Sequence, residues 1–263
     1  MTPNRSVVFG IHAFDSKVRV ESESDEMRDN LDRFLLPTLA RCEVTREAAD
    51  IAIAVQRAAG AFEVFLNDVR VGSAQTTHDA ALGAVKALDD ALVQKLRKLR
   101  AVHAGAVVLK GRALLIPGSS HAGKSSLVAE LLRRGAAHLS DEYALVDEKG
   151  RVHSYPRPLL LRNGGPGQTL VLPSDLDARF QVEPAEVGWI LAVDYDPEAA
   201  WNIKRVSQGE AVMLLLRNTP HEMDQSPEMI ELFTCCAAAA DCYAGTRCDV
   251  VEAAERILEL VAK

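Results

Sequence analysis

The sequence is poor in cysteine and contains no long apolar run. Five cysteines occur among 263 residues. An odd number without a targeting signal argues against a disulfide framework and favours reduced thiols. No window approaches the roughly 18 apolar residues that a membrane helix needs, and the N-terminal residues lack the apolar segment of a signal peptide. These absences predict a cytoplasmic protein with no membrane partner.

A basic run is also absent, and the formal net charge is −7. A phosphate backbone is bound by clustered Lys and Arg, so nucleic acid is a poor default partner, although a local basic patch is compatible with an acidic whole. The 48% apolar and 25% charged residues are ordinary for a globular protein with a sizeable core. The length allows one large α/β domain or two smaller ones.

The late cysteines raise the question of a metal site. Cys235, Cys236, Cys242 and Cys248 lie close together in the sequence, but their spacing does not match paired C-x₂-C knuckles. We favour buried structural cysteines over a zinc site.

The hydrophobic pattern predicts an α/β fold in two parts, with a change of pattern near residue 98. Residues 1–98 form a smaller α+β region, and residues 99–263 carry strands that alternate with helices. In the first part we expect strands at 7–12, 17–21 and 51–55, a strand pair over 62–71 joined at Asn67-Asp68, and helices at 26–39 and 77–97. In the second we expect strands at 102–109, 113–116, 136–139, 144–147, 151–155, 159–161, 187–193 and 202–206, and helices at 124–134, 209–217, 227–239 and 249–261. A tight turn at Gly111-Arg112 precedes the strand at 113–116, and Gly135 can end the helix at 124–134 in the left-handed conformation.

The segment from Gly118 to Ser125 fits G-x-x-x-x-G-K-[ST] at every position. The glycines allow successive N–H groups to point inward around phosphate oxygens. Lys124 opens a helix, where its charge adds to a dipole that already favours anions, and Ser125 offers a hydroxyl to Mg²⁺. The predicted nucleotide contacts are Gly118, Ser119, Ser120, His121, Ala122, Gly123, Lys124, Ser125 and Ser126.

Sequence context supports this interpretation. An apolar strand at 113–116 enters the loop, and a helix with Leu127, Val128, Leu131 and Leu132 on one side leaves it. The alternative is a glycine-rich turn without a ligand. His121 is a spacer in either case.

Phosphoryl transfer needs carboxylates beyond this loop. Asp141 and Glu142 follow the loop helix and a short strand, which would return them to the phosphate edge of the sheet. From spacing alone, a solvated acidic turn is an equal alternative.

The run from His103 to Glu142 resembles the core of the HPr kinase/phosphorylase superfamily, and in particular the stand-alone HPr-kinase-like proteins. The family has a histidine followed by a small residue on a strand ahead of the phosphate loop, and an acidic pair beyond the loop helix. In the stand-alone group a tyrosine often follows the pair, as Tyr143 does here. The segments 156–159 and 241–243 are also similar, whereas the first hundred residues match weakly.

The resemblance implies a P-loop kinase core, with ATP and Mg²⁺ as cofactors, and a role for each matching position. Glu142 matches the carboxylate that accepts the proton of the substrate hydroxyl, and Asp141, with Ser125, matches the metal side of the site. His103 matches the histidine beside the catalytic carboxylate; alone it would be an ordinary strand histidine. Arg157, and less clearly Arg162, could clamp the transferred phosphoryl group, or could be exposed loop arginines.

The chain departs from the regulatory enzymes of this family in two respects. Their glutamate-x-arginine-glycine signature is missing from residues 156–165, so the resemblance assigns neither HPr as the substrate nor reverse phosphorolysis. The second acidic position is Glu142 rather than the aspartate of those enzymes, so its reach to a serine hydroxyl would differ. Hexamers occur among the regulatory members, so a homo-oligomer is possible here.

Other segments leave alternatives open. Trp189 to Asp194 could be a Walker B strand, although we favour a structural strand. Residues 163–167 could be a flap or a plain loop, and Tyr143 and Tyr155 could stack on a base or pack in the core.

The sequence therefore predicts an ATP-dependent kinase acting on a hydroxyl group, with serine in a peptide, protein or small molecule as the first acceptor. The alternatives are a non-catalytic ATP-binding regulator, a biosynthetic kinase for a ribosomally made peptide and, least favoured, a nucleic-acid motor.

Overall fold

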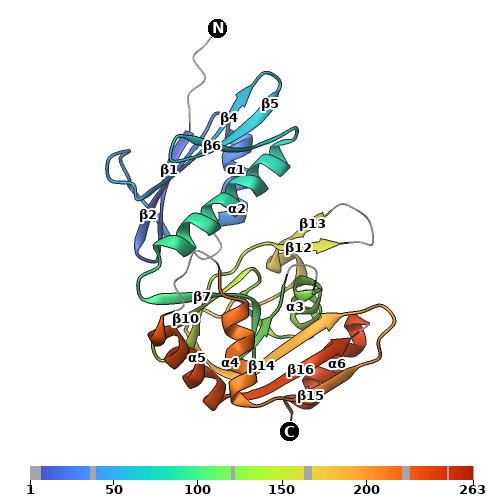
Figure 1. Cartoon of the computed structure of the whole chain (residues 1–263). Helices are drawn as coiled ribbons and strands as arrows, with labels where there is room; N and C mark the ends of the chain where they lie inside the picture. Colours follow the sequence, from blue (N-terminus) through green and yellow to red (C-terminus); the bar gives the residue numbers. More distant parts are fainter. Residues whose placement is uncertain are drawn as a thin grey trace. The chain divides into compact units, whose positions relative to one another are not determined.

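The computed structural model describes residues 7–35, 40–119, 122–162, 168–220, 226–247 and 249–262. The chain divides into two compact units, Met1–Arg97 and Lys98–Lys263, each with its own sheet (Figure 1). The protein is thus a mixed α/β protein with several sheets.

The first unit is a sheet covered by two helices. In its described part, six strands run in the order β3-β1-β2-β4-β5-β6, with only β2 and β4 parallel. Helix α2 contacts β4, β5 and β6, and α1 contacts β2 and α2. The elements are β1 (Val7–Ala13), β2 (Ser16–Ser22), α1 (Asp25–Leu35), β3 (Ala40–Cys42), β4 (Ile51–Ala58), β5 (Ala61–Leu66), β6 (Val69–Ala74) and α2 (Thr77–Lys95).

Local sequence explains these elements. Strand β2 alternates buried and more exposed residues, as expected when one sheet face packs on helices. The β5–β6 hairpin turns at Asn67 and Asp68, which both adopt positive φ, a conformation that these two residue types tolerate. Thr76 caps α2 by accepting a hydrogen bond from the Asp79 N–H.

The second unit contains an eight-stranded sheet, counted over the described residues, in the order β11-β10-β7-β8-β14-β16-β15, with β9 also paired to β7. Strand β11 pairs again with the start of β14, which closes a ring of five strands at that end. The elements are β7 (Leu99–Leu109), β8 (Arg112–Pro117), α3 (Lys124–Arg133), β9 (Ala137–Ser140), β10 (Tyr143–Asp147), β11 (Arg151–His153), β12 (Leu159–Arg162), β13 (Gln168–Val171), η1 (Pro173–Leu176), β14 (Ala185–Tyr195), β15 (Asn202–Arg205), α4 (Gln208–Arg217), α5 (Pro227–Ala239), β16 (Asp241–Arg247) and α6 (Val250–Leu260).

The strand order places a parallel trio, β8, β14 and β16, at the centre of this unit. Helices α3 and α6 pack together on one face of the sheet, and α4 and α5 pack together on the other (Figure 1). The carboxyl ends of parallel strands meet at one edge, which is where ligands bind in open α/β sheets. The loop from Gly118 to Gly123 lies at this edge because β8 ends at Pro117.

Several details differ from the sequence predictions. The turn before β8 is formed by Lys110 and Gly111, both with positive φ, so that Arg112 already belongs to the strand. Helix α1 is described from Asp25 to Leu35, and the predicted continuation to residue 39 lies outside the described part. Strands β3, β13 and β16 were not expected.

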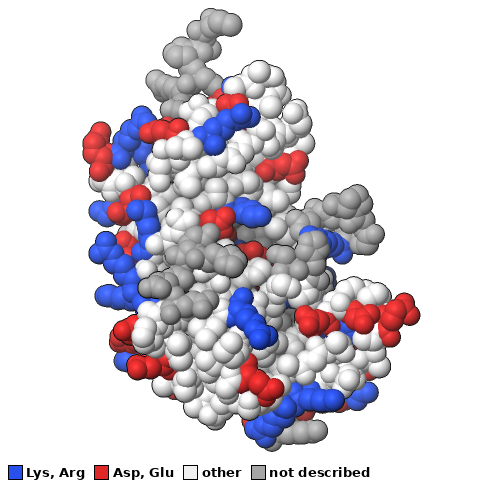
Figure 2. All heavy atoms as spheres, viewed as in Figure 1, with Lys and Arg blue, Asp and Glu red and all other residues white. Residues whose placement is uncertain are grey.

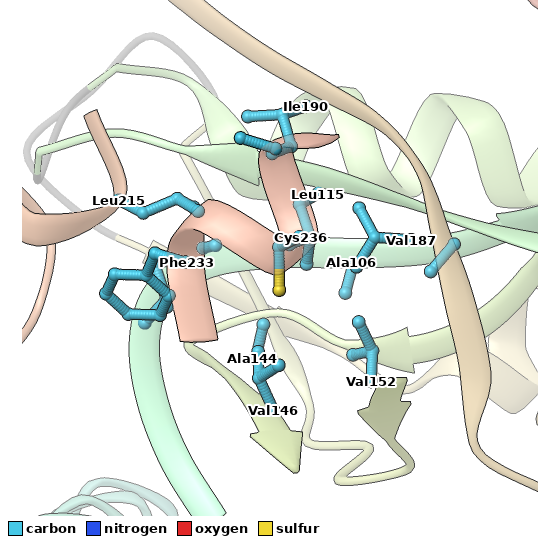
Figure 3. Close-up of a cluster of buried hydrophobic side chains, with 14 of the residues drawn as sticks. Ala106, Leu115, Ala144, Val146, Val152, Val187, Ile190, Leu215, Phe233 and Cys236 are labelled. Atoms are coloured by element: carbon cyan, nitrogen blue, oxygen red, sulfur yellow. The ribbon is translucent and has the colours of Figure 1, made fainter. Parts of the chain in front are cut away.

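Two of the late cysteines that the structure describes are buried in the second unit, whereas Cys235 is exposed, contrary to the prediction for that residue. Cys236 and Cys242 are buried in the α4–α5 side of the core, and Figure 3 shows the Cys236 sulfur among Ala106, Leu115 and Val187. Burial raises the pKa of the Cys236 thiol to about 12, which keeps it protonated. Cys235, Cys236 and Cys242 are free thiols, and Cys248 lies outside the described residues. Within the described ranges, no cluster of three His, Cys, Asp or Glu residues could hold a metal ion.

Charged side chains of both signs occur on each unit in the face shown in Figure 2. No helix in the described segments is long and apolar enough to cross a membrane.

Candidate functional site

The loop between β8 and α3 changes direction within a few residues. Gly123 has φ +75° and ψ 22° and precedes the first residue of α3, a left-handed conformation that glycine adopts without strain. A Cβ on Gly118 would lie 3.2 Å from the Cβ of Ala122, so this end of the loop is also tightly packed. Ser120 and His121 lie outside the described residues, and their predicted contacts stay predictions.

Lys124 places its ammonium against the loop that precedes it. Its Nζ donates to the carbonyl oxygens of Gly118 at 2.8 Å and Ser119 at 2.9 Å. The residue is 8% exposed, and burial lowers the pKa of the ammonium, against the opposing attraction of Glu142 and Asp141. A phosphate entering the loop would meet a positive charge held close to the backbone.

Asp141 lies buried at the carboxyl end of β9, beside the start of α3. It is 3% exposed, and burial raises the pKa of its carboxyl to about 6; the nearby Glu142 raises it further, while a hydrogen bond with Ser125 and the charges of Lys124 and His103 oppose the rise. Its Oδ1 is buried and has no hydrogen-bond partner within the part of the chain that the structure describes. A buried carboxylate oxygen without a partner costs free energy and calls for an explanation.

Helix α3 approaches β7 closely because β7 has a glycine at the crossing. A Cβ on Gly105 would lie 2.5 Å from Cγ2 of Val128 and 3.8 Å from Oδ1 of Asp141. Gly105 therefore lets the loop helix and the Asp141 carboxylate come together.

Glu142 and His103 form a pair next to Asp141. Tyr143 lies opposite His103 in the β10–β7 ladder, which brings the residue before it, Glu142, to the histidine. His103 Nε2 lies 3.2 Å from Glu142 Oε1, with side-chain exposures of 21% and 49%. The backbone N–H of His103 donates to the Asn218 carbonyl at 2.7 Å. A held histidine beside a half-exposed carboxylate can orient that carboxylate toward a bound acceptor.

The oxygen-rich set at Asp141 fits a hard divalent cation. Mg²⁺ takes oxygen ligands and usually keeps several waters, so a protein supplies only one or two groups. Ser125 lies close enough to Asp141 to lower the pKa of its carboxyl, and Oδ1 of Asp141 accepts no hydrogen bond from the described residues. These two residues are therefore chemically suitable as the protein ligands.

Arg157 lies at the same edge but is buried. Tyr155 pairs through a parallel bridge with Ser140, the residue before Asp141, and Arg157 stacks on the Tyr155 ring at 4.0 Å and donates to its hydroxyl at 2.7 Å. Arg157 is 3% exposed and Tyr155 1%, so this tyrosine packs in the interior. Arg162 ends β12 and is exposed.

The remaining sequence candidates are placed as follows. Residues Trp189 to Val193 of β14 pack mainly into the α3–α6 side of the core, and Asp194 is exposed near the strand's end. Residues 163–167 lie outside the described part. Tyr143 is partly buried, with its ring centroid 6.1 Å from that of His103.

Arg247 reaches the loop although the sequence analysis did not single it out. It ends β16 and donates from Nη2 to the Gly123 carbonyl at 2.8 Å. One signal in the sequence could have indicated Arg247. Asp249 is the N-cap of α6, so a strand that precedes this helix must end close to Arg247. Without β16 in the expected fold, that signal could not be used.

No protein-family model matches the chain, and no curated protein matches it. Among solved structures, the Hpr(Ser) kinase/phosphatase from Coxiella burnetii is similar at 16% identity and a TM-score of 0.32, over 62% of this chain and 94% of that one. A likeness at this level assigns neither a fold family nor a function to this chain.

Proposed function

We propose that this protein is a Mg²⁺-dependent kinase that transfers the γ-phosphoryl group of ATP to a hydroxyl acceptor. The observation that carries the proposal is Oδ1 of Asp141, which is buried without a hydrogen-bond partner among the described residues and lies close to Ser125 at the end of a segment with the G-x-x-x-x-G-K-[ST] sequence. A metal-bound phosphate is the ligand that would satisfy both features.

The loop residues would hold the phosphates. Lys124 exchanges its loop carbonyls for the β- and γ-phosphate oxygens, and the first N–H groups of α3 point at them with the favourable end of the helix dipole. Ser125 and Asp141 would hold Mg²⁺, which supplies positive charge to the phosphate oxygens when bound.

Glu142 is proposed as the base. Its carboxylate takes the proton from the acceptor hydroxyl, the acceptor oxygen forms a bond to the γ-phosphorus, and the bond from that phosphorus to the bridging oxygen breaks to release ADP. Because half of the Glu142 side chain is exposed, an acceptor can reach it. His103, at 3.2 Å, keeps the carboxylate in place.

Serine is the first acceptor to test, since the family resemblance implies it. Peptides, proteins and small molecules with a hydroxyl group all belong to the proposed class.

The test is the release or transfer of the γ-phosphate by the wild type and by Glu142→Gln, with Mg²⁺ and with Mg²⁺ chelated. General-base catalysis contributes typically about 10²–10⁴-fold, so Glu142→Gln is expected to lose at least about a hundredfold in turnover and to keep its ATP affinity. The matched control is Glu148→Gln, an exposed glutamate in the β10–β11 turn. Equal turnover in wild type and Glu142→Gln would remove the base assignment, and ATP binding without any turnover in the wild type would favour a non-catalytic ATP-binding regulator.

A further inference from the structure

Two central parallel strands bring a second pair of side chains to the loop. Tyr195 ends β14 and Arg247 ends β16, and the two residues are direct partners in the parallel ladder. Strands β14 and β16 lie on one side of β8 in the sheet, and β7, which contains His103, and β10, which follows Glu142, lie on the other. The loop after β8 therefore has the acidic residues on one flank and Arg247 on the opposite flank.

Arg247 is held rigidly against the loop. The residue is 2% exposed, its Nη2 donates to the Gly123 carbonyl at 2.8 Å, and its guanidinium lies 5.5 Å from the Tyr195 ring centroid. The Tyr195 side chain is nearby as well, because a Cβ on Gly123 would lie 3.6 Å from the Cβ of Tyr195.

The hydrogen bonds of the Gly123 carbonyl fix the orientation of the peptide at the end of the loop. It accepts the first helical hydrogen bond of α3, from the Leu127 N–H at 3.1 Å, and the bond from Arg247 in addition. In a planar trans peptide the C=O and the following N–H point in opposite directions. A carbonyl fixed toward α3 and Arg247 therefore aims the Lys124 N–H back out of the helix N-terminus, toward the loop where phosphate would bind.

The same contact explains a second demand on Gly123. Besides its positive φ, any Cβ at this position would lie 2.3 Å from Nη2 of Arg247. A residue with a Cβ at position 123 would therefore clash with the Arg247 guanidinium, so the two residues constrain each other.

The positive charge of Arg247 also favours the binding of a phosphate in the loop. A guanidinium stays protonated at all relevant pH values, and its interaction with other charges is stronger in a buried setting than in water. A triphosphate in the loop would bring negative charge close to this buried cation.

We propose that Arg247 is a positioning residue of the nucleotide site, which fixes the Gly123–Lys124 peptide and adds positive charge on the flank opposite Asp141 and Glu142. The ligand class is a nucleoside di- or triphosphate, recognised through its phosphates rather than its base. This inference rests on the proposed nucleotide site but not on catalytic transfer.

The experiment compares dissociation constants for MgATP, MgADP and adenosine in the full chain, for wild type, Arg247→Met and Arg247→Lys. Arg247→Met is expected to weaken MgATP about tenfold, which corresponds to about 1.4 kcal/mol, and to leave adenosine within about twofold, since adenosine has no phosphate for the loop. Arg247→Lys keeps the positive charge, and its dissociation constant for MgATP is expected to lie between those of the wild type and Arg247→Met.

Arg112→Met is the matched control. Arg112 begins β8 at the end away from the loop, lies 5.8 Å from the Trp189 ring and donates to the carbonyls of Val187 and Ala239. Like Arg247, it contacts an aromatic ring and donates to backbone carbonyls, but it lies away from the loop. Arg112→Met should therefore leave the MgATP affinity unchanged.

If Arg247→Met does not fold, Tyr195→Leu gives the same test from the other side. Tyr195 is 50% exposed, so its ring can be removed with little loss of core, and MgATP should weaken while adenosine does not. Unchanged MgATP affinity in the folded variants, or an equal loss for adenosine and MgATP, would overturn the inference. Wild type that binds MgATP without phosphoryl transfer would contradict only the kinase proposal.

Discussion

The buried carboxylate of Asp141, when ionised, lowers the stability of the folded protein. Its pKa of about 6 lies above that of an unfolded aspartate, about 3.9, because burial disfavours the charged form. A raised carboxyl pKa means that the folded state loses stability as the pH rises from about 4 to above 6, since ionisation is easier in the unfolded chain. A cation bound by Oδ1 would remove this cost, which is how the residue can be retained for function.

We therefore expect Asp141→Asn to stabilise the nucleotide-free, Mg²⁺-free protein at pH 8 by roughly 1–3 kcal/mol, and the gain to shrink toward zero near pH 4. Urea unfolding followed by tryptophan fluorescence measures this, because Trp189 and Trp201 both lie in the second unit. Glu148→Gln serves as the control and should show no such gain. A loss of stability at pH 8 would mean that the Asp141 carboxylate is satisfied within the protein.

The elements around the loop were largely predictable, because each has a strong local pattern. The apolar residues of α3 that the pattern selected, Leu127, Val128, Leu131 and Leu132, are all buried, and Gly135 ends the helix in the left-handed conformation as expected. The loop helix and the β5–β6 hairpin thus follow from periodicity and turn chemistry.

Strand β16 was missed because its sequence, Asp-Cys-Tyr-Ala-Gly-Thr-Arg, contains small residues and no alternating apolar pattern. It is a strand because β14 and β15 pair with it on both sides, a tertiary effect that local propensity does not contain. Arg247 was missed with it. The proximity of His103 to Glu142 was given by family resemblance, whereas the contact itself depends on the β7–β10 register.

The packing of α3 on β7 gives a prediction at the scale of helices and strands. Gly105→Ala would place a Cβ 2.5 Å from Cγ2 of Val128, so the helix must move and carry Lys124 and Ser125 with it. Overpacking of this kind costs typically about 1–3 kcal/mol. Because the branched Val128 side chain is stiff at χ1, we expect the helix to take up part of the shift and ATP affinity to fall as well. Adding Val128→Ala creates space, so the double variant should recover part of both losses in a double-mutant cycle. Strictly additive effects would show that this contact does not position the helix.

At the scale of the whole molecule, every residue of the proposed site belongs to the unit Lys98–Lys263. That unit has its own helices on both faces of its sheet and its own core. We expect residues 98–263 expressed alone to fold cooperatively and to bind MgATP within about threefold of the full chain, because a compact unit with its own core can fold independently. Thermal unfolding and calorimetry on the fragment measure this. A folded fragment without ATP affinity would mean that residues 1–97 contribute to the site.

The central claim is that the loop from Gly118 to Ser125 binds a nucleoside triphosphate, and calorimetric titration of the full chain with MgATP tests it most directly. Lys124→Ala removes the ammonium from the loop, and Lys149→Ala, an exposed lysine in the β10–β11 turn, is the control. We predict saturable binding to wild type and Lys149→Ala, and at least a tenfold loss, about 1.4 kcal/mol, in Lys124→Ala. Wild type that binds no nucleotide, or Lys124→Ala that binds as well as wild type, would contradict the account.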